Sequence, residues 1–144
     1  MIAIASAETV AIRAMLVIDS VAAGILHPAV VREHLQEGWL FGAFFVVVAT
    51  IQILSVIPII LRDSGMTYPA LAIVNGSVIA IWIVSRTIGI PFGPHASMPE
   101  PVGAIDLAAT AFETLVLAGS LVVARRRMMR GSFRSAHTTR SALA

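Results

Sequence analysis

The chain contains no cysteine and no lysine, and few of its 144 residues carry a charge. The absence of cysteine excludes disulfides, thiolate metal sites, iron–sulfur clusters and cysteine nucleophiles. Only 12% of the residues are charged, which is about half the fraction typical of soluble domains. The sequence also has no phosphate loop, dinucleotide fingerprint, G-x-S-x-G elbow or H-E-x-x-H motif. It therefore carries no signature of these catalytic or cofactor-binding classes, and an enzyme is the less favoured interpretation.

Apolar sequence takes the place of charge: 58% of the residues are hydrophobic and the mean hydropathy is +0.90. A stretch of about 20 apolar residues is long enough to cross a bilayer as a helix. Four such stretches occur, at approximately residues 10–26, 39–61, 70–88 and 102–123. We therefore predict an all-α integral membrane protein, in which residues 1–124 form an antiparallel four-helix bundle surrounded by lipid.

The arginines predict how the bundle is oriented. Residues 1–124 hold four arginines and all eight acids, a formal charge of −4. The other six arginines follow the fourth stretch, at Arg125, Arg126, Arg127, Arg130, Arg134 and Arg140. Arginine beside a span marks the cytoplasmic side, and four crossings then place both termini there. We expect residues 125–144 to be a basic, disordered cytoplasmic tail of a bacterial plasma-membrane protein, with no role in nucleic-acid binding.

Two longer links, His27–Gly38 and Ile88–Gly103, then face outward. The first span is expected to end before Pro28, with a short amphipathic helix following on the outer surface. The second link contains four prolines, which restrict the backbone and indicate a loop of defined shape.

Polar residues within the predicted spans should face the bundle interior, because exposing them to lipid is costly. These residues are Asp19, Gln52, Asn75, Arg86, Asp106 and Glu113. Arg86 and Asp106 lie at similar depth near the outer ends of their spans, so we expect them to form a salt bridge. Asp19 and Glu113 lie deeper, without an obvious basic partner. Three interpretations stay open for them: hydrogen bonds to Gln52, Asn75 or a carbonyl, a proton or cation relay, or contact with a partner subunit.

Histidines and glutamates gather in the two outer links. The candidate metal ligands are His27, His34, Glu37, His95 and Glu100. His34 and Glu37 are three residues apart and would share a helical face. Imidazole and carboxylate ligands suit Zn²⁺ or Cu²⁺, whereas haem ligation by two histidines is less favoured. The alternative is that these side chains form ordinary hydrogen bonds at the membrane interface.

Two segments carry a family resemblance. HPAVVREHLQEGWLFG begins at His27, and PFGPHASMPEPVGAIDLAATAFE runs from Pro91 to Glu113. Together they resemble small, uncharacterised four-span membrane proteins of actinobacterial type. The resemblance implies the four-span topology and implies that the polar outer residues belong together, but it implies no activity.

Three functional hypotheses follow from the sequence. The first is a small membrane protein that binds a metal ion or small ligand at its extracytoplasmic mouth. The second is a non-catalytic accessory subunit of a larger membrane complex or a homo-oligomer. The third is a proton-coupled small transporter that uses Asp19 and Glu113.

Overall fold

The computed structural model describes residues 7–61 and 64–142, with side chains described as far as Met129. The helices are α1 (Ala7–Glu37), α2 (Trp39–Leu54), α3 (Val56–Leu61), α4 (Thr67–Thr87) and α5 (Ala104–Ala142). Four segments are long and apolar enough to cross a membrane: Ala7–Glu37, Trp39–Leu61, Thr67–Thr87 and Ala104–Met129. The predictions of an all-helical chain and of four candidate spans are confirmed over the described residues.

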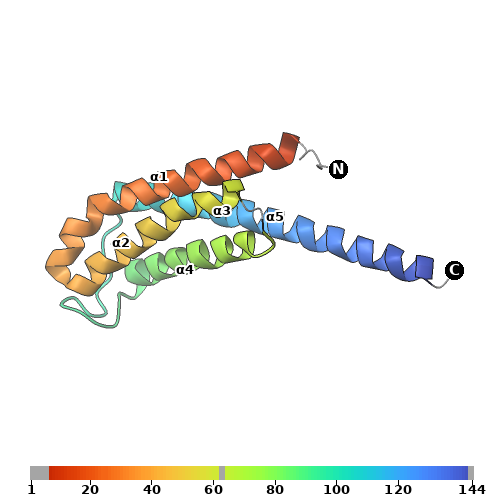
Figure 1. Ribbon diagram of the computed structural model, residues 1–144. Helices are drawn as coiled ribbons and strands as arrows, with labels where there is room; N and C mark the ends of the chain where they lie inside the picture. Colours follow the sequence, from red (N-terminus) through yellow and green to blue (C-terminus); the bar gives the residue numbers. More distant parts are fainter. Residues whose placement is uncertain (1–6, 62–63, 143–144) are drawn as a thin grey trace.

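The long helices lie side by side, and the chain reverses direction from each to the next (Figure 1). Helix α1 packs against α2, α3 and α5, and α4 packs against α5. The α1–α2 turn and the α4–α5 loop lie at one end of the molecule, and the start of α1 and the end of α5 lie toward the other (Figure 1). The buried apolar core is formed by Leu16, Ile59, Tyr68, Leu71, Val116 and Val123.

Helix α1 corrects the prediction that the first span ends before Pro28. Pro28 removes one backbone hydrogen bond, to Gly24, but the helix continues to Glu37. Its buried residues His27, Val30 and His34 are spaced as one helical face. The reversal occurs at Gly38, whose φ of 156° and ψ of 147° belong to a region that only glycine adopts readily. The first link is therefore the last part of a long helix, and its histidines are buried.

The second span is interrupted at Ser55, between α2 and α3. Pro58 has no N–H to donate to the carbonyl of Leu54, which accounts for a break in the helix at this point. Arg13 of α1 holds the following segment in place by donating to the carbonyl oxygens of Ile59, at 3.2 Å, and Ile60, at 3.1 Å. These cross-helix bonds satisfy two carbonyls that the end of α3 would otherwise leave open.

The outward faces of the helices are apolar. Large hydrophobic side chains are exposed along every span, including Ile18, Val47, Ile73 and Leu121. A monomeric soluble protein seldom exposes so continuous an apolar surface. The fold therefore suits a lipid environment, as the sequence predicts.

Helix α5 extends well beyond the predicted fourth span. The backbone remains helical to Ala142, whereas residues 125–144 were expected to lack regular structure. Alanine, arginine and methionine favour helix, and the start of the extension is held by contacts to the bundle. Arg126 donates to Glu8 at 2.7 Å, and the guanidinium of Arg127 lies 4.8 Å from the ring centroid of Tyr68. The side chains of Arg130, Arg134 and Arg140 lie outside the described part of the structure.

Candidate functional site

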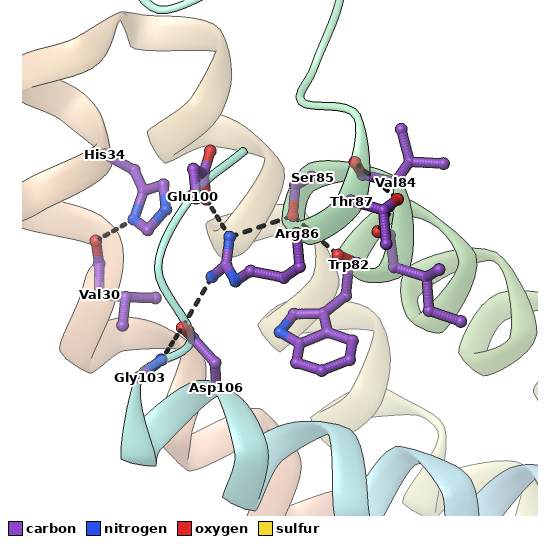
Figure 2. Close-up of polar contacts among 11 residues, drawn as sticks. Val30, His34, Trp82, Val84, Ser85, Arg86, Thr87, Glu100, Gly103 and Asp106 are labelled. Atoms are coloured by element: carbon purple, nitrogen blue, oxygen red, sulfur yellow. Dashed lines mark hydrogen bonds and ion pairs between the residues drawn. The ribbon is translucent and has the colours of Figure 1, made fainter. Parts of the chain in front are cut away.

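Arg86, on the last turn of α4, joins two carboxylates from different parts of the chain. Its Nη2 atom donates to Oδ2 of Asp106 on α5 at 2.7 Å, and Nη1 donates to a carboxylate oxygen of Glu100. Only 9% of the Arg86 side chain is exposed. The predicted Arg86–Asp106 salt bridge is therefore confirmed (Figure 2). Glu100, which the sequence analysis assigns to the candidate metal ligands, is a second partner of Arg86.

The loop between α4 and α5 positions Glu100. The amide of Glu100 donates to the carbonyl of Ser85 at 2.9 Å, and the amide of Ser97 donates to Ile90 at 2.8 Å. Gly89 has a φ of 75°, and a Cβ there would lie 2.5 Å from the backbone nitrogen of Met98. The chain can therefore fold back tightly only with glycine at this point. The loop has a defined shape and returns Glu100 to the end of α4.

Glu113 has partners on two other helices. Its Oε1 atom lies 3.0 Å from Nε2 of His27 on α1 and accepts a hydrogen bond from Nε2 of Gln52 on α2 at 3.1 Å. All three residues are almost completely buried. Of the three interpretations left open for the deep acids, a hydrogen bond to Gln52 is observed for Glu113. The expectation that Glu113 lacks a basic partner is wrong, because the continuation of α1 brings His27 into the bundle.

His34 also points inward. Its Nδ1 atom lies 2.8 Å from the carbonyl oxygen of Val30, one turn earlier in α1 (Figure 2). A carbonyl can only accept a hydrogen bond, so Nδ1 is the protonated nitrogen of this ring. The ring centroid lies 4.3 Å from that of Phe45 on α2, and the His27 ring lies 5.7 Å from the same phenyl group. Both histidines thus pack against one aromatic side chain.

These residues surround a cavity of about 460 Å³ near the end of the bundle that carries the α4–α5 loop. Helices α1, α2, α4 and α5 and the loop all contribute to its walls. Most of the lining is apolar, with five large aromatic side chains: Phe41, Phe44, Phe45, Trp82 and Phe92. The polar side chains on its walls include His27, His34, Arg86, Glu100, Asp106 and Glu113. The sequence pattern does not show that these aromatic side chains line one cavity. The four-residue spacing of Trp82 and Arg86 does place those two on one helical face.

The five candidate metal ligands are divided between two cavities. His27 and His34 line the larger cavity, whereas Glu37 and His95 line a neighbouring one of about 250 Å³, and only Glu100 lines both. Among the side chains described, those of residues 7–61 and 64–129, no group of three or more His, Asp or Glu is arranged to hold a metal ion. The Zn²⁺ or Cu²⁺ site expected from the sequence therefore has no support in the geometry. Helix α1 turns its histidines inward, while His95 lies exposed on the loop.

The two remaining intramembrane candidates lie apart from this cavity. Asn75 is buried and donates to the carbonyl of Leu71 at 2.9 Å, within its own helix. The described hydrogen bonds of Glu113 go to His27 and Gln52, not to Asn75. Asp19 is also buried, and its Oδ2 atom has no hydrogen-bond partner among the residues that the structure describes. Neither residue lines the 460 Å³ cavity.

No protein-family model matches the chain, and neither the curated proteins nor the solved structures that were compared with it include a match. The resemblance to actinobacterial four-span proteins and the accessory-subunit hypothesis therefore stay predictions.

Proposed function

We propose that the protein is a multi-pass protein of the bacterial plasma membrane that binds a small, largely apolar molecule inside its helical bundle. In this proposal the four spans form an antiparallel bundle with both termini in the cytoplasm. The observation that carries the proposal is the 460 Å³ cavity, which is walled by all four spans and by the α4–α5 loop. It corresponds to the small-ligand form of the first hypothesis.

The size and chemistry of the cavity support this function. Sites for small molecules commonly enclose about 300–1,000 Å³ and combine apolar walls with a few fixed polar groups. Here the aromatic side chains supply the walls, and the buried groups around Arg86 and Glu113 supply fixed polar positions. These polar groups are already held by partners from other helices, so little ordering is needed when a ligand binds.

The direction in which the cavity faces follows from charge. The cavity is lined by residues of the α4–α5 loop and of the first turns of α5, whereas Arg125, Arg126 and Arg127 come much later in the same helix. Arginine-rich flanks favour the cytoplasmic side. The ligand would therefore bind in the extracytoplasmic half of the protein, where an amphipathic molecule arrives from the outer leaflet or the external medium.

Calorimetry with 2-methylnaphthalene as the probe tests this function directly. The purified chain in detergent micelles should bind the probe saturably, with about one molecule per chain, because the site is a defined cavity. Empty micelles provide the matched control for partitioning into detergent. Heats that rise without saturation, as in empty micelles, would contradict the proposal.

A second candidate function, a proton or cation relay, is favoured by one observation. Glu113 is buried within the bundle and contacts the titratable ring of His27 at 3.0 Å. An ionisable pair in the interior of a membrane protein often marks a proton pathway. Purified protein in vesicles containing a pH-sensitive dye tests this function. Proton flux that Glu113→Gln abolishes would support the relay, and flux equal to that of empty vesicles would contradict it.

A further inference from the structure

Two side chains of α4 that line the cavity each carry a buried N–H donor without a hydrogen-bond partner among the described residues. The donors are Nε1 of Trp82 and Nε of Arg86, and both atoms are buried. Both residues line the 460 Å³ cavity, and their four-residue spacing places them on one face of α4. In Figure 2 the two side chains extend from α4 toward the same side. A buried donor without a partner is unfavourable, so a ligand that offers an acceptor here gains affinity.

The two donors belong to side chains that lie next to each other. The guanidinium carbon of Arg86 lies 6.0 Å from the centroid of the Trp82 ring. Each donor reaches an oxygen at about 2.9 Å, and a carbonyl oxygen has two lone pairs that can accept from two N–H groups. The Nη1 atom of the guanidinium donates to Glu100 and Ser85, and Nη2 donates to Asp106. Nε is the guanidinium nitrogen without a partner among the described residues.

Charge decides what kind of acceptor fits. The single positive charge of Arg86 is met by two carboxylates, Glu100 and Asp106, which leaves this cluster with a formal charge of −1. A further carboxylate or phosphate would be repelled in a low-dielectric interior, where charge interactions are strong. A neutral carbonyl oxygen accepts the same hydrogen bonds without adding negative charge.

The walls favour a flat ring beside that oxygen. Phe41 and Phe92 stack with ring centroids 5.8 Å apart, and Phe45 packs on both cavity histidines. Aromatic side chains make favourable offset or edge contacts with other rings. Aliphatic side chains from α1 and α4, among them Val30, Val78 and Ile81, complete an apolar surface.

We infer that the cavity takes an uncharged, ring-bearing molecule whose carbonyl oxygen accepts hydrogen bonds from Trp82 and Arg86. This inference rests on the proposed ligand-binding function and names its ligand class.

Three probes of similar size test the inference on the unaltered chain in micelles. They are 2-methyl-1,4-naphthoquinone, 2-methylnaphthalene and 2-naphthoate, which offer carbonyl oxygens, no oxygen, and an anionic oxygen. The chain has no cysteine, so the quinone cannot form a thiol adduct. Calorimetry should show that the quinone binds about tenfold more tightly than 2-methylnaphthalene, as expected for the hydrogen bonds gained. The anion should bind most weakly.

Trp82→Phe then removes one donor while keeping an aromatic ring in place. Affinity for the quinone should fall severalfold more than affinity for 2-methylnaphthalene, because only the quinone loses a hydrogen bond. Trp39→Phe is the matched control, because Trp39 is 72% exposed, and it should leave both affinities unchanged. Circular dichroism establishes that the variants keep their helices, and the three-probe comparison does not depend on any variant.

The outcomes separate this inference from the proposed function. Saturable binding of 2-methylnaphthalene with no preference for the quinone, or tighter binding of 2-naphthoate, would overturn the inference and leave the ligand-binding function standing. The absence of saturable binding by every probe would overturn both. A preference for the quinone that Trp82→Phe reduces supports both.

Discussion

The Nε2 atom of His27 lies 3.0 Å from Oε1 of Glu113, although 86 residues separate them in the sequence. Gln52 donates to the same carboxylate oxygen at 3.1 Å, so side chains from α1, α2 and α5 meet at one atom. Such a buried junction links three spans through polar contacts that lipid cannot replace. Because His27 and Glu113 also line the cavity, the same contacts connect the cavity wall to the packing of the helices.

Replacing Glu113 tests this junction. Glu113→Leu should lower the free energy of unfolding by about 2–5 kcal/mol, because it leaves the buried His27 and Gln52 groups without their shared acceptor. Glu113→Gln keeps an acceptor oxygen and should cost less than about 1.5 kcal/mol. Denaturant unfolding in micelles measures both. Equal losses for the two variants would show that the hydrogen bonds do not stabilise the bundle.

The Arg86–Asp106 pair should show strong coupling in a double-mutant cycle. Arg86→Ala leaves two nearby carboxylates without a cation and should lower the free energy of unfolding by about 3–5 kcal/mol. Adding Asp106→Ala to this variant should cost much less than Asp106→Ala costs alone, because the pair is already broken. Arg32→Ala, at an exposed position on α1, is the control and should cost less than about 0.5 kcal/mol. Additive effects of the Arg86 and Asp106 substitutions would contradict a direct pair.

Gly24 should be required for the close approach of α1 and α2. A Cβ at Gly24 would lie 2.9 Å from the side chain of Ile53 and 3.3 Å from the carbonyl oxygen of Ala49, whereas at Gly76 the nearest atom is 3.8 Å away. Both substitutions to alanine gain the same helix propensity, about 0.8–1.0 kcal/mol. Thermal unfolding should therefore find Gly76→Ala more stable than Gly24→Ala by about 1–3 kcal/mol. Equal stabilities would mean that Ile53 moves aside without cost.

The predicted orientation can be measured by cysteine labelling, since the natural chain has no cysteine. A membrane-impermeant maleimide added to intact cells should label Ser97→Cys, on the α4–α5 loop, because this loop is expected to be extracytoplasmic. It should label Ser135→Cys only after the cells are permeabilised. Labelling in the reverse order would invert the topology and place the cavity on the cytoplasmic side.

The spans and one salt bridge could be predicted from the sequence because each depends on local information. Hydropathy over about 20 residues locates a span, and the second span, residues 39–61, has the same bounds in the structure. Arg86 and Asp106 flank one loop, so their similar depth follows from the spans alone. Their pairing needs no knowledge of how the other helices pack.

The inward placement of the histidines does not follow from the usual effect of a proline, because Pro28 would be expected to end the helix. The spacing of His27, Val30 and His34 is that of a helical face, and it was the signal that could have shown the continuation of α1. The partners of Glu113 and Arg86 depend instead on which helices become neighbours and on how the proline-rich loop returns. These contacts, like the shape of the cavity, join residues that are far apart in the chain. Local sequence patterns therefore do not predict them.

A matched pair of substitutions on α5 tests the central claim, that the 460 Å³ cavity binds a ligand, most directly. Ala109 is 5% exposed and lines the cavity, whereas Ala111, two residues later, is exposed on the outer surface. Ala109→Phe should occupy the cavity and weaken calorimetric binding of 2-methyl-1,4-naphthoquinone by tenfold or more, which corresponds to a loss of at least about 1.4 kcal/mol. Ala111→Phe should leave the affinity unchanged. Equal affinity in the two variants, with both fully helical, would show that the ligand does not bind in this cavity.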